Sequence, residues 1–365
     1  MRGTALAATM HPIRTAESAG IVRRAGRLSG AAALAGLVMS GVAVAPAVAA
    51  PTDVPTVLGS ADRVLCTFDS RELSEVSGIA LSRQHEDTLW VTNDSGGGPY
   101  LYALDTNDCS IQAELTLLDT PARDHEALAI GRDAQGNDVI WVGDIGDNRE
   151  SWPYARIHKV IEPAELVDAD VPVTTYRYTY PEGPLNAEAL IADPKRERLW
   201  VITKEAGVGG VYALPRSLSD STTPMLAKKV GTARSQVTDA AMAPGGKRYV
   251  VRDYLSAEVF TGKPPGEAES RFGLPLQFQG EAITWTADGK GLLVASERSG
   301  DLIQVDVPAT ALGTDGGIAG ALPRVAGFDI YPYVRIVGMV LVALVALMLL
   351  RRSVRRSRRR RRTGR

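Results

Sequence analysis

The sequence predicts an all-β fold, a five-bladed β-propeller closed by an N-terminal strand, and three observations support this prediction. First, a polar residue followed by a small residue and then usually a larger apolar one recurs at Ser77, Glu126, Glu188, Asp239 and Glu281, spaced 49, 62, 51 and 42 residues apart. Periods of about 40–50 residues are typical of propellers and solenoids. Second, each copy is followed by β-rich runs joined by Gly, Pro or Asp-Gly turns. Third, 60–307 holds no long stretch with helical periodicity.

Each repeat offers about four strands, which is the size of a propeller blade. In the first repeat we expect strands at 77–81, 88–92, 100–104 and 112–118. In the later repeats the first two strands meet across short turns, at 135–137, 193–195, 244–246 and 288–290. Glycine, proline and aspartate reach the backbone angles of such turns at little cost, so these breaks predict hairpins.

The two ends of the predicted propeller complete one blade together. The last repeat stops after its third strand, 301–305, and the strand 63–68 has no repeat of its own. Pairing them would close the ring and remove an exposed sheet edge. A six-bladed ring is the alternative, because 149–185 is long and holds extra strands such as 174–180.

The N-terminus resembles a secretory signal. A leader with Arg14, Arg23, Arg24 and Arg27 precedes an apolar stretch at 29–45 and an Ala-x-Ala cleavage site at 47–49. We therefore expect a signal peptide at 1–49, an irregular segment at 50–62 and the propeller at 63–307.

The C-terminus predicts a membrane anchor. An Ala- and Gly-rich linker at 308–330 leads to a 20-residue apolar segment at 331–350, long enough to cross a bilayer. Ten of the fifteen residues in 351–365 are arginine, which favours a cytoplasmic tail beside anionic lipid. The predicted protein is thus a single-pass protein of the cell membrane with an extracytoplasmic propeller. A buried core helix at 331–350 is one alternative. A wall-sorting signal at 322–350 is another, although its motif at 322–327 departs from L-P-x-T-G.

Charge and cysteine content narrow the class of partner. Residues 51–335 contain 26 Lys and Arg against 41 Asp and Glu, a net charge of −15. This balance disfavours nucleic acid as a partner and suits cations. Cys66 and Cys109 both lie in the exported part, where a disulfide is allowed, and we expect one; two buried free thiols are the alternative.

If the first strand of each blade lines the channel, the polar residues of all blades gather at one mouth. The start of the first strand and the end of the antiparallel second strand lie on the same face. The second strands end near Asn93, Asp94, Asp144, Lys204, Arg252 and Arg298, which we take as candidate ligand-binding residues. Asp147 and Asn148 join them, because the loop 143–148 is rich in oxygen ligands; a turn capped by its own side chains is the alternative for this loop.

A ring of carboxylates around one opening is unfavourable unless something neutralises it. One solution is a hard cation such as Ca²⁺, held by Glu126, Glu188, Asp239 and Glu281. A second is pairing with Lys204, Arg252 and Arg298. A third is water together with raised carboxyl pKa values. The sequence leaves all three open.

Catalytic residues are less clearly indicated. The candidates are His125 and Glu126, and His125 could act as a general base. The alternative is that His125 is a hydrogen-bonded residue in the channel wall. The chain has neither a G-x-S-x-G elbow nor an H-E-x-x-H zinc helix. Whether the protein is an enzyme stays open.

Several motifs together resemble a group of exported bacterial β-propellers. They are L-S-E-x-S-G-I-A at 73–80, L-W-V-x-N-D-S-G at 89–96, D-x-E at 124–126 and D-I-G-D-N at 144–148. The chain is similar over about 63–307 to phytase-like, "esterase-like" propellers and to periplasmic propellers named for regulation by a quorum sensor. The resemblance implies the propeller fold and Ca²⁺ at Glu126, Glu188 and Glu281. The sequence departs from these relatives at Lys204, Arg252 and Arg298, the basic positions near the mouth.

These observations favour a membrane-anchored binding or scaffold module of the cell envelope. Its acidic mouth would hold Ca²⁺ or a small polar ligand, and the sequence does not identify the envelope ligand or protein that it would bind. The alternative is a metal-dependent hydrolase of phosphate or other esters, as the phytase-like resemblance implies.

Overall fold

A computed structural model describes residue 58 and residues 62–68, 71–94, 96–297 and 299–312 of the 365-residue chain. The predicted signal peptide, transmembrane segment and arginine tail lie outside these residues, as does Arg298. No helix within the described ranges has the length and apolar character that crossing a membrane requires. The predictions about anchoring and export therefore stay predictions.

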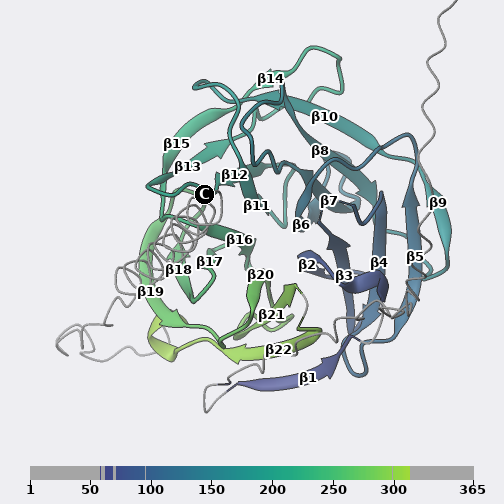
Figure 1. Ribbon diagram of the computed structural model, residues 1–365, viewed down its shortest axis with the longest axis vertical. Coiled ribbons are helices and arrows are strands. Elements are labelled where there is room, and N and C mark those ends of the chain that lie inside the picture. Colours follow the sequence, from purple (N-terminus) through teal and green to yellow (C-terminus); the bar gives the residue numbers. More distant parts are fainter. Residues whose placement is uncertain (1–57, 59–61, 69–70, 95, 298, 313–365) are drawn as a thin grey trace, which may run out of the picture. The chain divides into compact units, whose positions relative to one another are not determined.

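Five sheets, each built mainly of antiparallel strands, surround a central axis, which confirms the five-bladed β-propeller (Figure 1). We number these sheets blades 1 to 5 in chain order. The innermost strand of each blade is the one that carries the repeated phrase, and each contacts the innermost strands of both neighbouring blades around the ring. These strands are β2 (Val76–Leu81), β6 (His125–Arg132), β11 (Ala187–Ala192), β16 (Val237–Met242) and β20 (Gln279–Trp285).

The remaining strands of each blade follow outward from the axis. Blade 1 adds β3 (Thr88–Asn93), β4 (Tyr100–Asp105) and β5 (Ile111–Leu117); blade 2 adds β7 (Asp138–Asp144), β8 (Ala155–Ile161) and β10 (Thr174–Thr179). Blade 3 adds β12 (Leu199–Thr203), β13 (Gly209–Ala213) and β15 (Lys228–Ala233); blade 4 adds β17 (Arg248–Asp253), β18 (Ser256–Thr261) and β19 (Glu267–Gly273). Two short 3₁₀ helices, η1 (Arg71–Leu73) and η2 (Ala309–Leu312), flank the strands.

Blade 5 is closed by the N-terminal strand, as the sequence predicts. It consists of β20, β21 (Gly291–Glu297), β22 (Asp301–Asp306) and β1 (Arg63–Thr67). Strand β1 pairs antiparallel with β22, so residues more than 230 positions apart complete one sheet. The ring therefore closes without leaving β22 as a free edge.

Two extra outer strands, one from the long second repeat and one from the third, are present instead of a sixth blade. Strand β9 (Ala169–Val171) pairs in parallel with β5 of blade 1, and β14 (Met225–Leu226) pairs in parallel with β10 of blade 2. Each adds a fifth strand at the rim of its sheet. The six-bladed alternative is therefore wrong.

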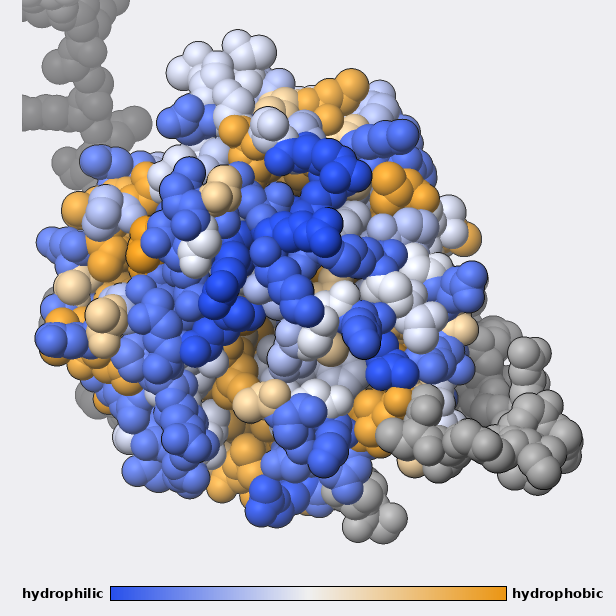
Figure 2. Space-filling view, turned by 180° about the vertical axis from the view of Figure 1, so that it is seen from behind, coloured by the Kyte–Doolittle hydropathy of each residue, from blue (hydrophilic) through white to orange (hydrophobic). Residues whose placement is uncertain are grey.

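The core is divided among the five junctions between neighbouring blades. Each junction holds one hydrophobic cluster, for example Trp90 and Leu101 of blade 1 against Leu128 and Ile140 of blade 2. Most side chains of the inner three strands are buried because each face of a blade packs on a neighbour. The outer surface is different: in Figure 2 hydrophilic residues cover most of the visible described face, and apolar residues form small separate patches.

Cys66 and Cys109 form the predicted disulfide, with their Cα atoms 5.6 Å apart. Cys66 lies on β1, the closing strand of blade 5, and Cys109 lies in the turn between β4 and β5 of blade 1. The bond therefore joins the first and last blades, where the ring closes.

Replacing both cysteines by alanine should lower the free energy of unfolding by about 3–4 kcal/mol, because the bond closes a loop of 43 residues in the unfolded chain. Urea unfolding of the double variant measures this loss. An unchanged midpoint would show that β1 stays in place without the disulfide.

Candidate functional site

Every innermost strand contains a β-bulge at its start. The pairing with the second strand shifts by one residue there, and one residue has no partner across the ladder. A bulge redirects the side chain of that extra residue, and bulges are common beside functional sites. The unpaired residues are Ser77, Glu126, Glu188, Thr238 and Glu281.

This register places Asp239 differently from the sequence prediction. In blade 4 the bulged residue is Thr238, so Asp239 occupies the position of the small residue in the other blades. Its carboxylate is fully buried and accepts hydrogen bonds from the backbone N–H groups of Ala240 and Ile283, both at 2.7 Å. Asp239 thus ties blade 4 to blade 5 and does not share the position of the three channel glutamates.

The two bulged hydroxyl residues tie neighbouring blades together. Ser77 Oγ donates to the carbonyl of His125 at 2.7 Å, and Thr238 Oγ1 donates to the carbonyl of Gly280 at 3.2 Å. Each carbonyl belongs to the residue just before the bulge of the next blade. The remaining three bulged residues are glutamates.

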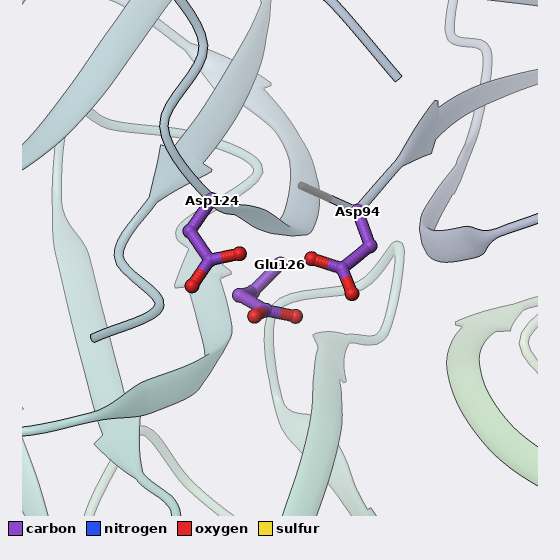
Figure 3. Close-up of side chains that lie close together, drawn as sticks. All are labelled: Asp94, Asp124 and Glu126. Carbon is purple, nitrogen blue, oxygen red and sulfur yellow. The ribbon is translucent and has the colours of Figure 1, made fainter. Parts of the chain in front are cut away.

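Asp94, Asp124 and Glu126 form the tightest group of acids. One oxygen of each lies within 4.8 Å of the others, and Figure 3 shows the three carboxylates turned toward one another. They come from two blades: Asp94 follows β3, Asp124 directly precedes β6 and Glu126 is the second residue of β6. Gly146 packs directly on this group, since a Cβ at that position would overlap Glu126 Oε1 and Asp124 Oδ2.

Three further carboxyls lie in the same mouth. Glu188, Glu281 and Glu297 are each about 4 % exposed or less. The charges of Glu188 and Glu281 help to raise the pKa of Glu126, and the charge of Glu281 helps to raise that of Glu297. We call Asp94, Asp124, Glu126, Glu188, Glu281 and Glu297 the mouth carboxyls.

Burial and repulsion from neighbouring carboxylates raise the pKa values of Asp124, Glu126 and Glu297. Burial, followed by the charges of Glu188 and Asp94, raises the pKa of Glu126 well above its usual range. Burial, with a hydrogen bond and repulsion from Asp94, raises the pKa of Asp124 to about 8. Burial and Glu281 likewise raise the pKa of Glu297 to about 8. The mouth is therefore a site where a cation would be favourable.

Lys204 supplies part of the compensation. Its ammonium lies 3.1 Å from Glu188 Oε1 and 5.2 Å from the centre of the Tyr254 ring. Burial raises the pKa of Glu188 to about 7 even though Lys204 lowers it. Among the described residues, Lys204 is the only basic side chain that forms an ion pair with a mouth carboxyl.

Arg252 does not enter the mouth. It is fully buried between blades 4 and 5, where Nη1 donates to the carbonyl of Ala282 at 2.7 Å and to that of Ala295 at 3.3 Å. Gly280 makes room for it, because a Cβ there would overlap Arg252 Nη2. Arg252 is therefore held by structural contacts at a blade junction.

Asp144 is also occupied by structural contacts. Its carboxylate accepts hydrogen bonds from the guanidiniums of Arg123 and Arg156 and from the backbone N–H groups of Arg123 and Asp124. Although burial opposes it, His158 and the surrounding positive groups hold the pKa of Asp144 well below its usual range. Asp144 thus positions the segment that carries Asp124, and it acts on the mouth only through that segment.

Asp147 and Asn148 support the mouth from its edge. Asp147 Oδ2 accepts hydrogen bonds from the backbone N–H groups of Ser151 and Trp152, each at 2.7 Å, so its carboxylate caps a turn. The Asp147 N–H donates to Asn186 Oδ1, and Asn186 Nδ2 donates to Glu188 Oε1 at 3.2 Å and to Asn148 Oδ1 at 3.3 Å. The oxygen-rich loop is therefore a capped turn linked through Asn186 to a mouth carboxyl.

His125 is unsuited to act on a ligand in the mouth. The side chain is fully buried, and its Nδ1 lies 3.3 Å from Thr92 Oγ1 of blade 1. Burial lowers its pKa to about 4, which keeps the imidazole neutral at pH 7. Within the described structure His125 is a wall residue between blades 1 and 2.

One hydrogen bond orients the Asn93 side chain, and its amide oxygen has no hydrogen-bond partner among the described residues. Its Nδ2 donates to the carbonyl of Glu72, whereas its buried Oδ1 accepts no hydrogen bond from the described residues. Asn93 directly precedes Asp94 of the acidic group.

The sequence analysis did not select Asp124 and Asn186 as site residues. Each stands two positions before a glutamate of the repeated phrase, so the spacing of the repeat could have indicated them. Glu297 ends the second strand of the last repeat, where the antiparallel argument places polar residues at the mouth. Their contribution depends on contacts between blades, which no single repeat reveals.

The mouth face also carries a separate cleft of about 210 Å³ beside Asp147. Its walls are mainly aromatic and apolar and include Trp152, Tyr154, Tyr180 and Leu185. The Arg123 Cζ atom lies 4.0 Å from the centre of the Trp152 ring, and this cation–π contact holds the wall in place.

Comparison with known proteins adds little. No family model matches the chain, and no curated protein matches it. Among solved structures it is similar to the PQQ-bound form of aldose sugar dehydrogenase from Streptomyces coelicolor, with a TM-score of 0.41 and 13% identity over 68% of this chain and 97% of that one. The site must therefore be judged from its own residues.

The metal-free protein should become less stable as pH rises from about 6.5 to about 8. Asp124, Glu188 and Glu297 have raised pKa values in the fold, so the folded chain holds protons that the unfolded chain has already released. We expect a loss on the order of 2 kcal/mol, measured by urea unfolding in the presence of a chelator. The window lies above the ordinary pKa of histidine, so His125, whose pKa is lowered, contributes little there.

Glu297→Gln should reduce the change in the free energy of unfolding over this pH interval, because an amide side chain cannot ionise. A wild-type protein whose stability rises over the same pH interval would contradict the proton-holding mouth.

Proposed function

We propose that the protein is an envelope binding module whose mouth binds one divalent cation, Ca²⁺, and uses it to hold an oxygen-rich ligand. The observation that carries this proposal is the convergence of six carboxyls from blades 1, 2, 3 and 5, buried or nearly so, on one opening. Such a cluster is stabilised by a cation and destabilised by its absence.

The donor chemistry favours calcium over transition metals. Ca²⁺ takes six to eight oxygen ligands in flexible geometry, from carboxylates, amide carbonyls and water. The group of Asp94, Asp124 and Glu126 supplies carboxylate oxygens alone, and no described histidine or cysteine belongs to it. Nitrogen and sulfur donors would instead point to zinc or copper.

Three carboxylates leave part of the coordination shell open to water or to a ligand. A ligand bearing carboxylate, hydroxyl or phosphate oxygens could complete it, and Lys204 stands across the mouth beside Glu188. The predicted signal peptide and membrane anchor would place this site outside the cytoplasm, where free calcium is abundant enough for a weak site.

The ester-hydrolase alternative gains no specific support from the described residues. A general base must come within hydrogen-bond reach of the reacting group. His125 is fully buried and faces blade 1, and Glu126 is the remaining candidate. We therefore rank binding above hydrolysis.

Calcium should stabilise the chelator-treated full-length chain and so raise its unfolding temperature. At a calcium concentration 100 times the dissociation constant, the free energy of unfolding should rise by about 2.7 kcal/mol. Glu126→Gln should weaken calcium binding about tenfold or more, because it removes one charged ligand. Isothermal titration calorimetry with Ca²⁺ measures the affinity directly.

Glu165→Gln is the matched control, since Glu165 is an exposed carboxylate outside the mouth. Equal affinity in wild type and Glu126→Gln would refute the proposed ligand set. Calcium-dependent hydrolysis of p-nitrophenyl phosphate, lost in Glu126→Gln alone, would move the assignment to the hydrolase.

A further inference from the structure

A second polar pocket lies at the other end of the blades. Strand β11 begins beside the mouth near Glu188 and ends just before Asp193, which lines this pocket between blades 3 and 4. The cavity measures about 370 Å³. Its walls come from the β11–β12 turn, the end of β13 with the residues that follow it, the β18–β19 turn, and single residues of β12 and β15.

The lining of this pocket is basic, in contrast to the acidic mouth. Four cationic side chains and two carboxylates line it, which leaves two positive charges uncompensated. The cations are Arg196, Arg198, Arg216 and Lys263, and the acids are Asp193 and Glu197. Lys263 pairs with the buried Asp193, so that lysine is already neutralised.

Arg198 is held in position by contacts that leave its charge unpaired. Its Nη1 donates to the carbonyl of Leu214, and its guanidinium lies over the Trp200 ring, 5.4 Å from the centre. No described carboxylate forms an ion pair with Arg198 or with Arg216. A guanidinium fixed in this way loses little conformational entropy when it binds an anion.

Arg198 and Arg216 are also close enough to repel each other. Burial, followed by the positive charge of Arg216, lowers the pKa of Arg198. Two like charges that line one cavity are stabilised by an anion that contacts both.

We propose that this pocket binds a phosphate monoester through Arg198 and Arg216. The planar guanidinium fork matches the oxygens of phosphate, with two parallel N–H···O bonds from each arginine. A phosphate monoester carries about −1.5 to −2 charges near pH 7, which matches the two uncompensated positive charges of the lining. The ligand is a small phosphorylated molecule or the terminal phosphate of a polymer, and both offer the same group.

This site is independent of the proposed calcium site. The two share no residue, and they lie at opposite ends of β11. Failure of one proposal therefore leaves the other standing.

Titration calorimetry of the full-length chain with inorganic phosphate, glycerol 3-phosphate and the phosphodiester dimethyl phosphate tests the proposal. Saturable binding of the first two is expected, at least about tenfold tighter than that of the singly charged diester. Arg216→Gln should weaken phosphate binding about tenfold, and the Arg198→Gln/Arg216→Gln double variant should abolish it. Arg216 is exposed and makes no described hydrogen bond, so its single variant is expected to fold.

Arg149→Gln, a change at an exposed arginine of the β7–β8 loop, is the matched control and should bind phosphate as wild type does. A phosphate-capped polymer that binds where glycerol 3-phosphate does not would identify the polymer as the source. The proposal is overturned by absent saturation at millimolar phosphate, by equal affinity for acetate and phosphate, or by an Arg216→Gln variant with wild-type affinity.

Discussion

The bulge at the start of each innermost strand is the constraint on which the rest of the mouth depends. In a regular strand, neighbouring side chains point to opposite faces of the sheet and would pack between the blades. One unpaired residue breaks that alternation. In three blades the redirected residue is Glu126, Glu188 or Glu281, and in two it is a hydroxyl residue that bonds the next blade. The same local device thus both joins the ring and supplies the acids.

Concentrating acids on the axis is unfavourable, and the surrounding structure shows how the fold tolerates it. Arg252 and Asp239 are buried at the junction of blades 4 and 5 and are satisfied largely by backbone groups. Asp144 draws two arginines and His158 around it at the edge of blade 2. These contacts fix the blades and the segments that carry the mouth carboxyls, and Lys204 forms an ion pair with Glu188.

Much of the fold could be predicted from the sequence because the blade is a local unit. The recurring phrase, the hairpin turns and the spare strand 63–68 are all visible along the chain, and they give five blades and their closure. The disulfide was expected from the predicted export of the segment that carries both cysteines. The extra strands β9 and β14 were not assigned, because a parallel pairing at the rim has no turn signal of its own.

The site was less predictable because residue type does not reveal register. Thr238 and Asp239 are both polar, and only the ladder shows which of them is bulged. Asp144 and Asp147 looked like ligands, yet arginines and backbone N–H groups occupy them. The position of Asp124 depends on Asp144, whose carboxylate accepts a hydrogen bond from the Asp124 backbone N–H. These two residues are twenty positions apart in the sequence, so no local pattern reveals the contact.

Anomalous diffraction from crystals of the full-length chain grown with Ca²⁺ tests the central claim most directly, since it locates the ion without reference to activity. The account predicts one strong peak enclosed by the carboxylates of Asp94, Asp124 and Glu126. A mouth without a peak at saturating calcium, or an ion bound only elsewhere on the propeller, would contradict it.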